Sequence, residues 1–192
     1  MARAFIRKVS GLGIVVSVYR REAAGSDPHV HAFRALSALV NHCREADALV
    51  SILPDVAGTR RFISHRILSN MKPTACLVNL GRGAVLDEPA LIEALQHGMI
   101  AGAALDVFVT EPLPHDSPLW DLENVLISPH VAGRFDGGEP ASHPPVHRTL
   151  EGSPLPRHAA VPVVYGFVPP TRTTDDSHPH MRPYWGRRSS KC

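Results

Sequence analysis

An arginine, a glutamate and a histidine stand where three successive apolar runs of the chain end. Arg82, Glu111 and His130 each follow such a run, and glycine or proline flanks each of them. A guanidinium can bind a carboxylate bidentately or polarise a neighbouring carbonyl, and an imidazole paired with a carboxylate can donate a proton to an oxygen and take it back. Brought together, the three groups could bind a small 2-oxo acid and move a proton to or from its keto oxygen.

The sequence predicts a parallel sheet that would bring these groups together. Short apolar runs rich in β-branched residues predict buried strands at residues 14–19, 48–53, 75–79, 100–106 and 125–127. Helical patterns predict helices at residues 2–10, 33–44 and 65–71, and one between Asp87, its expected N-cap, and Gly98, which should end it. This alternation is typical of an α/β fold with a doubly wound, Rossmann-like parallel sheet, which binds ligands at the carboxyl ends of its strands.

A change of composition after Gly133 predicts a boundary. Prolines and histidines recur through the last part of the chain without helical or strand periodicity, so we expect residues 1–135 to form the folded domain and residues 136–192 a disordered tail. Residues 161–168 are the exception, because their apolar run fits either a short strand or an exposed sticky segment. The tail histidines have spacings that match no ligand pattern, and we expect no metal site there: His143, His147, His158, His178 and His180.

Charge, cysteine usage and hydropathy exclude several classes of protein. The formal net charge is only +2, which argues against a nucleic-acid partner. Cys43, Cys76 and Cys192 are scattered without a CxxC pair, and no apolar run is long enough for a membrane span. These features predict a soluble cytoplasmic protein without nucleic-acid or membrane partners.

Three ordered motifs resemble a known family. Residues 79–83 (Asn-Leu-Gly-Arg-Gly), 105–113 (Leu-Asp-Val-Phe-Val-Thr-Glu-Pro-Leu) and 128–133 (Ser-Pro-His-Val-Ala-Gly) are similar to the NAD(P)-binding domain of the D-isomer-specific 2-hydroxyacid dehydrogenases, over roughly residues 1–135. The resemblance implies an oxidoreductase that transfers a hydride between NAD(P)H and a small 2-oxo or 2-hydroxy acid of the glyoxylate or hydroxypyruvate class. It implies Arg82, Glu111 and His130 as the catalytic residues, and a homodimer. It also implies a cofactor site made of Arg20, Arg21, Pro54, Thr59, Leu80, Gly81, Arg82, Asp106, His130 and Gly133.

The chain departs from the family pattern at its start. The family's glycine-rich fingerprint GxGxxG, which follows the first strand and cradles the pyrophosphate, is not present, and Met1 aligns just after it. Gly11 and Gly13 are no substitute, because Val16 stands at the third glycine position. We therefore expect an incomplete sheet that lacks its first strand, with two apolar edges unpaired and weak or no activity alone. An upstream truncation and a frameshift or aberrant splice near Gly133 would explain both ends.

A second departure concerns cofactor choice. Arg20 and Arg21 stand where NAD-preferring proteins carry an acidic residue for the ribose, and two guanidiniums suit the 2′-phosphate of NADP. Two solvated arginines at a strand end are the alternative. Two further alternatives stay open: a non-catalytic dinucleotide-binding or regulatory protein on the same scaffold, and a non-functional truncated product.

Overall fold

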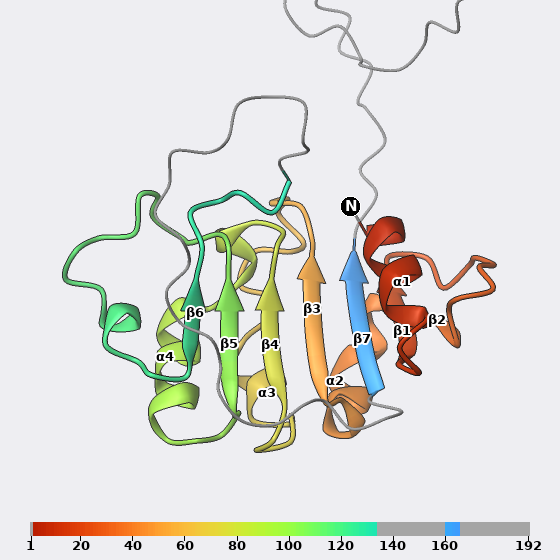
Figure 1. Cartoon of the computed structure of the whole chain (residues 1–192), viewed down its shortest axis with the longest axis horizontal. Coiled ribbons are helices and arrows are strands. Elements are labelled where there is room, and N and C mark those ends of the chain that lie inside the picture. The colour runs from red at the N-terminus through yellow and green to blue at the C-terminus, as the bar shows by residue number, and fades with distance from the viewer. Residues whose placement is uncertain (1, 134–159, 166–192) are drawn as a thin grey trace, which may run out of the picture.

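Seven strands form a single parallel sheet in the computed structural model, which describes residues 2–133 and 160–165. The strand order is β2-β1-β7-β3-β4-β5-β6, and every paired neighbour runs in the same direction. The arrowheads of β3 to β7 in Figure 1 therefore point to one edge of the sheet. The prediction of an α/β fold with a doubly wound parallel sheet is confirmed.

The five strands expected from apolar runs are present with slightly different bounds. They are β1 (Val15–Arg20), β3 (Ala48–Ile52), β4 (Cys76–Asn79), β5 (Gly102–Leu105) and β6 (Val125–Ile127). Both faces of a parallel sheet are covered, so its strands are almost continuously apolar, as these runs are. The central strand β3 is the clearest case, because four of its five residues are buried.

The helix expected over residues 33–44 is wrong in its first part. Residues Ala32–Ala35 form the edge strand β2, which pairs with β1 from Ser17 to Arg20. Helical structure follows only afterwards, in the short pieces η1 (Leu36–Ala38), α2 (Leu39–His42) and η2 (Cys43–Glu45). Pairing to a free strand edge overrides the weak helical preference of this segment.

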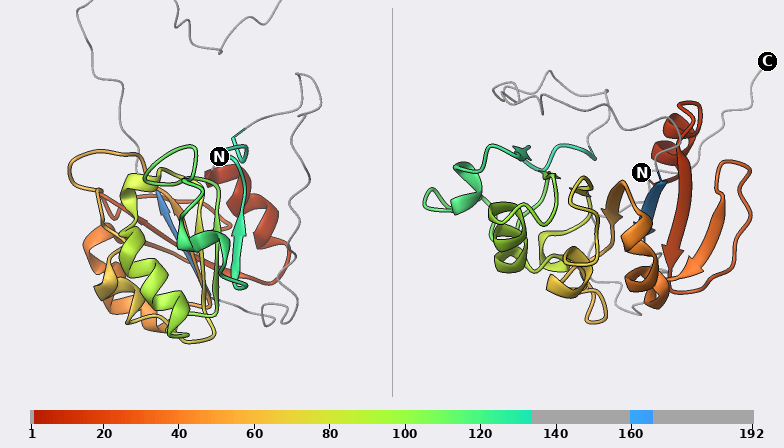
Figure 2. Two further views of the ribbon diagram at one scale, coloured as in Figure 1. Left: turned by 90° about the vertical axis from the view of Figure 1, so that its left-hand side faces the viewer. Right: turned by 90° about the horizontal axis from the view of Figure 1, so that it is seen from below.

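Helices cover the two faces of the sheet unequally. α1 (Ala2–Ser10) packs on one face, whereas α2, α3 (His65–Leu68) and α4 (Glu88–Gln96) lie on the other (Figures 1 and 2). The larger apolar core lies under α2, α3 and α4, and a smaller one lies between α1 and the strands that it covers. No helix among residues 2–133 has the length and apolar character needed to cross a bilayer.

α4 begins and ends where the sequence predicts, but Asp87 does not cap it through a hydrogen bond. The helix begins directly after Asp87, and Gly98 follows its end with a φ of +64°, a conformation that glycine adopts without strain. Asp87 makes no capping hydrogen bond, because both oxygens of its carboxylate accept from Nη2 of Arg61 at 2.8 Å. The expected N-cap residue is therefore half of an ion pair.

The expectation of two unpaired strand edges is wrong. β7 (Ala160–Tyr165) lies between β1 and β3 and pairs with both of them. In the doubly wound order 3-2-1-4-5-6 this is the position of the first strand. The sheet is thus completed by a segment from the second half of the chain. Of the two interpretations of residues 161–168, the strand is correct for residues 161–165, and residues 166–168 lie outside the described ranges. The other residues of the predicted tail, with its five histidines, lie outside the described ranges.

Candidate active site

The predicted catalytic residues follow three adjacent strands at the carboxyl edge of the sheet. Arg82 comes shortly after β4, Glu111 lies in the segment after β5, and His130 comes shortly after β6. Asp106, one of the predicted cofactor residues, directly follows β5. β4, β5 and β6 are neighbours in the strand order, so their ends are side by side (Figure 1). Parallel pairing alone is what gathers these residues, which are far apart in the sequence.

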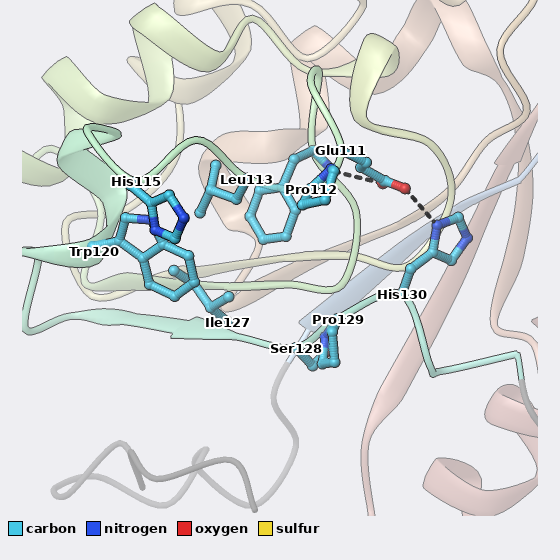
Figure 3. Close-up of a pocket in the computed structure, with 10 residues that line it drawn as sticks. Glu111, Pro112, Leu113, His115, Trp120, Ile127, Ser128, Pro129 and His130 are labelled. Atoms are coloured by element: carbon cyan, nitrogen blue, oxygen red, sulfur yellow. Dashed lines mark hydrogen bonds and ion pairs between the residues drawn. The ribbon is translucent and has the colours of Figure 1, made fainter. Parts of the chain in front are cut away.

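Glu111 and His130 form a hydrogen-bonded pair. Nδ1 of His130 lies 2.9 Å from Oε2 of Glu111, and the other carboxylate oxygen accepts from the backbone N–H of Phe108 at 3.0 Å (Figure 3). The side chain of His130 is 45% exposed and that of Glu111 is 38% exposed, so the pair is open to solvent. The Phe108 N–H and the imidazole together fix the orientation of the carboxylate.

The charge of Glu111 determines the tautomer of the ring. Partial burial raises the pKa of Glu111, but the hydrogen bonds from His130 and from the Phe108 N–H, and the positive charges of His130 and Arg82, outweigh burial and leave that pKa below its ordinary value. An ionised carboxylate only accepts hydrogen bonds, so Nδ1 must carry the proton. Nε2 is then the nitrogen that gains or loses a proton, and it points away from Glu111 (Figure 3).

Asp106 holds the segment that carries the histidine. Its carboxylate is 2% exposed and accepts from the backbone N–H groups of Val131 and Ala132, each at 2.9 Å, and from the hydroxyl of Ser128. His130 itself has a φ of +55°, in the left-handed region that few residues other than glycine adopt. These hydrogen bonds hold the strained backbone in place. Asp106 therefore positions His130, a role that the sequence did not predict; its contact with a cofactor stays a prediction.

Arg82 lies near the pair without contacting it through a hydrogen bond. Its side chain is exposed at the end of β4, and Nη1 donates to the Gly81 carbonyl at 2.7 Å. The buried Asn79 shapes this turn, because its side chain accepts from the Gly81 N–H and donates to the Arg82 carbonyl, both at 3.3 Å. The charge of Arg82 is close enough to lower the pKa of Glu111. The Arg82 guanidinium and the Glu111–His130 pair, here called the dyad, thus lie at one edge of the sheet and influence each other electrostatically.

Two glycines beside Arg82 allow close approach of neighbouring strand ends. A β-carbon at Gly81 would lie 2.4 Å from the Leu53 carbonyl oxygen, and one at Gly83 would lie 1.8 Å from the Phe108 carbonyl oxygen. No side chain can occupy that space without moving backbone. The glycines of this motif therefore bring the ends of β3 and β4 and the loop of Glu111 together.

The other predicted cofactor residues lie along the same edge. Pro54 follows β3, and the buried Thr59 closes the loop behind it, with its hydroxyl 2.5 Å from the Pro54 carbonyl. Leu80 is fixed by its N–H, which donates to the Ser51 carbonyl at 2.9 Å. Gly133 is exposed at the end of the first described range.

Arg20 and Arg21 lie at the end of β1, at the other side of the sheet. The Arg20 guanidinium stacks over the Phe33 ring at 5.4 Å from the ring centre, and its Nε donates to the Glu22 carbonyl at 3.0 Å. Arg21 is exposed. The first arginine is therefore held in one orientation, whereas a merely solvated side chain would not need such contacts.

A pocket of about 550 Å³ lies beside the dyad. Glu111 and His130 line it, but Arg82 does not. Its walls are mainly apolar and include Phe108, Leu113, Trp120 and Ile127 (Figure 3). Because Nε2 of His130 points away from it, the pocket lies behind the dyad rather than on the side where a proton would be transferred. No sequence pattern predicts this pocket, although its wall contains Trp120, an aromatic residue that is 47% exposed.

The described residues contain neither a metal cluster nor a cysteine with a lowered pKa. No group of three or more histidine, cysteine, aspartate or glutamate side chains among those residues could hold a metal ion. The free cysteines Cys43 and Cys76 are buried or partly buried, and burial raises the pKa of both thiols. Neither thiol has the lowered pKa of a reactive cysteine.

The lowered pKa of Glu111 predicts a small dependence of stability on pH. Its carboxylate stabilises the folded chain above the pKa of the unfolded state, near the ordinary 4.5, and this contribution is lost as the pH falls through the lower pKa of the folded state. Because the group is 38% exposed, we expect the loss to be at most about 0.5 kcal/mol. Between pH 6 and pH 3 the free energy of unfolding, measured with urea, should therefore fall slightly less in Glu111→Gln than in the wild type. Glu93→Gln, the same change at an exposed helix position, is the control, and an identical pH profile for all three proteins would contradict the expectation.

Comparison with known proteins identifies the scaffold. The profile of the D-isomer specific 2-hydroxyacid dehydrogenase, NAD binding domain, matches residues 1–132. Glyoxylate/hydroxypyruvate reductase B of Pectobacterium carotovorum is 56% identical over 87 residues, covering 45% of this chain and 27% of the relative. Glyoxylate reductase of Thermococcus gammatolerans is 35% identical over 173 residues, covering 89% of this chain and 48% of the relative. The chain thus spans less than half the length of either curated relative.

Solved structures give the same result. Phosphoglycerate dehydrogenase from Lactobacillus plantarum superposes with a TM-score of 0.65 at 36% identity, covering 69% of this chain and 42% of that one. The NADPH-dependent glyoxylate/hydroxypyruvate reductase from Sinorhizobium meliloti, in complex with NADP and malonate, superposes with a TM-score of 0.61 at 34% identity, covering 70% and 40%. The family match confirms the resemblance found in the motifs. The chain belongs to the D-isomer specific 2-hydroxyacid dehydrogenases, a family of NAD(P)-dependent oxidoreductases, through their NAD binding domain.

Proposed function

We propose that this chain reduces a small 2-oxo acid of the glyoxylate or hydroxypyruvate class with a hydride from NADPH. The observation that carries the proposal is the hydrogen bond of 2.9 Å between Glu111 and His130 at the strand edge that also carries Arg82. The names of the Pectobacterium, Thermococcus and Sinorhizobium relatives support the substrate class. The cofactor, when bound, supplies the hydride.

Each of the three side chains has a distinct role in this proposal. Arg82 binds the substrate carboxylate or polarises the keto oxygen, which a planar guanidinium does more selectively than a lysine. His130 donates the proton on Nε2 to the oxygen as it becomes an alkoxide, and takes the proton back in the reverse reaction. Glu111 keeps the other ring nitrogen protonated and stabilises the imidazolium.

The residues along the carboxyl edge fit a dinucleotide. Gly81 packs against the backbone of Leu53, so no side chain stands between the ends of β3 and β4 at this edge. Pro54, Thr59 and Leu80 would line the nicotinamide side, and Arg20 and Arg21 would meet the 2′-phosphate at the end of β1. The N-terminal end of α1 lies at the same edge (Figure 1), where a helix dipole favours phosphate.

The arginine pair predicts a preference for NADPH over NADH. Replacing Arg20 by Ala should weaken NADPH binding about tenfold and leave NADH binding almost unchanged, because one charge-assisted hydrogen bond to the 2′-phosphate is lost. Fluorescence titration with both cofactors measures the ratio. Arg44→Ala removes an exposed arginine far from this edge and should not change it. Equal weakening for both cofactors would show that Arg20 does not recognise the 2′-phosphate.

The proposal is tested with the purified chain. NADPH fluorescence should rise saturably on binding, and absorbance at the NADPH band should fall when glyoxylate or hydroxypyruvate is added. Saturable binding of NADPH without turnover of either acid would contradict the proposed reaction. It would still support the binding of a dinucleotide.

A second candidate is a dinucleotide-binding protein without turnover. The observation that favours it is the exposure of the dyad, because active sites that transfer a hydride usually exclude water from the reacting groups. The same titration separates the two candidates.

A further inference from the structure

β7 is what joins the two halves of the sheet. β1 pairs with β2 and with β7, β3 pairs with β4 and with β7, and within the described sheet no ladder joins β1 to β3. The half with α1, β1 and β2 carries Arg20 and Arg21. The half with β3 to β6 carries Pro54, Arg82 and the dyad.

The register of β7 shows how it makes this connection. It pairs with β1 from Val15 opposite Ala160 to Tyr19 opposite Val164. Its pairing with β3 begins only at Val163, opposite Val50, and continues to Tyr165. Proline cannot donate to a ladder, and Pro162 is the residue directly before the β3 pairing begins. The ladder toward β1 is therefore longer than the ladder toward β3.

Packing around Val163 adds a second connection. Val163 is fully buried in the smaller core. That core joins Ile6 of α1 and Val16 and Val18 of β1 to Ala48 and Val50 of β3. One side chain from β7 thus lies in a core to which both halves of the sheet contribute.

We propose that β7 is a positioning strand for the cofactor site: it sets the distance and orientation between the arginine pair at the end of β1 and the nicotinamide side of the site at the ends of β3 and β4. A dinucleotide spans the point where the strand order reverses, and here that point lies at β7 and β3. The inference rests on the proposed binding of NADPH. It assigns a role in cofactor binding to residues 160–165, which lie outside the family match over residues 1–132.

The full-length chain with Val163→Asp or Val163→Ala tests this role. A buried carboxylate at this position should open the β7 ladders, and the milder Val163→Ala leaves a cavity in the shared core. In Val163→Ala we expect the amides of β1 to exchange with deuterium about tenfold faster while those of β4 and β5 keep their rates. The Kd for NADPH should rise about tenfold.

A second readout separates positioning from stability. In the wild type, NADPH should slow amide exchange at the ends of both β1 and β4. In Val163→Ala it should slow exchange at β4 as in the wild type but slow it less at β1, because the cavity loosens the contact between the two halves. Leu12→Ala, which shortens an apolar side chain that is 68% exposed and lies outside the sheet, is the control for Val163→Ala and should leave all three measurements unchanged.

The outcomes are distinguishable. Unchanged β1 exchange and unchanged NADPH binding in Val163→Ala would overturn the inference. A wild type that does not bind NADPH, with β1 exchange still accelerated in Val163→Ala, would overturn the proposed function and the cofactor role of β7, and would support β7 only as the strand that joins the sheet. If Val163→Asp does not fold, Val163→Ala decides.

Discussion

Replacing His130 by Gln should lower the turnover number by a factor of about 10²–10⁴, the usual contribution of general acid catalysis. Glutamine keeps a polar group of similar length beside Glu111 but cannot exchange a proton with the keto oxygen. The Kd for NADPH should stay within about twofold, because the loss affects an interaction with the reacting oxygen and not with the cofactor. Steady-state rates with hydroxypyruvate and fluorescence titration with NADPH measure the two effects.

His115 provides the matched control for this change. It is exposed and lines the pocket behind the dyad, but its ring takes no part in the pairing with Glu111. His115→Gln should retain the wild-type turnover number. If His130→Gln and His115→Gln have equal turnover, His130 is not the proton donor.

Replacing Gly83 by Ala should destabilise the chain by at least about 3 kcal/mol, which lowers the melting temperature by roughly 10 °C. The new β-carbon would lie 1.8 Å from the Phe108 carbonyl oxygen and 2.5 Å from the Val109 nitrogen. Both are backbone atoms, so no side-chain rotation can relieve the overlap. The loop must move, and with it the Phe108 N–H that binds Glu111.

Gly11 is the control for this substitution. A β-carbon there would meet no atom within 4 Å, and its φ is not in the left-handed region. Gly11→Ala should change the melting temperature by a few degrees at most. Thermal unfolding followed by circular dichroism measures both variants, and similar melting temperatures for Gly83→Ala and the wild type would contradict the close approach.

The strands were predictable because the composition of a buried strand is visible in a short stretch of sequence. β1 and β3 are continuous runs of apolar and β-branched residues that stop at a charged residue or at a proline, and the structure follows them within one residue. The helix at residues 33–44 was predicted wrongly because its first residues pair with the edge of β1, and a sequence pattern does not show which edge is free.

The sequence left a short strand at residues 161–168 open as one of two interpretations, but it did not predict that this strand pairs between β1 and β3. A proline within an apolar run argues against a central strand, and Pro162 stands inside this one. The prediction also treated the gap between β1 and β3 as an empty position, whereas a segment more than a hundred residues from β3 occupies it. Non-local pairing of this kind is decided by the free edges that the rest of the fold offers.

The candidate site was predicted in part. The pairing of Glu111 with His130 followed from the motifs, because parallel strand ends meet at one edge. The role of Asp106 in holding the His130 segment did not follow, since backbone N–H groups of residues 131 and 132 have no signature in the sequence. The apolar pocket was missed as well, because its walls come from a loop without periodicity.

In the proposed reaction this chain moves a hydride from the nicotinamide ring to the keto carbon of a small acid. Hydroxypyruvate is incubated with the chain and with NADPH that carries deuterium at both C4 positions of the nicotinamide, and the product is examined by mass spectrometry and NMR. The wild type should form glycerate with deuterium at C2, and His130→Gln should form no detectable labelled product over the same time. Unlabelled hydroxypyruvate recovered in full from the wild-type reaction, under conditions where NADPH is bound, would contradict it.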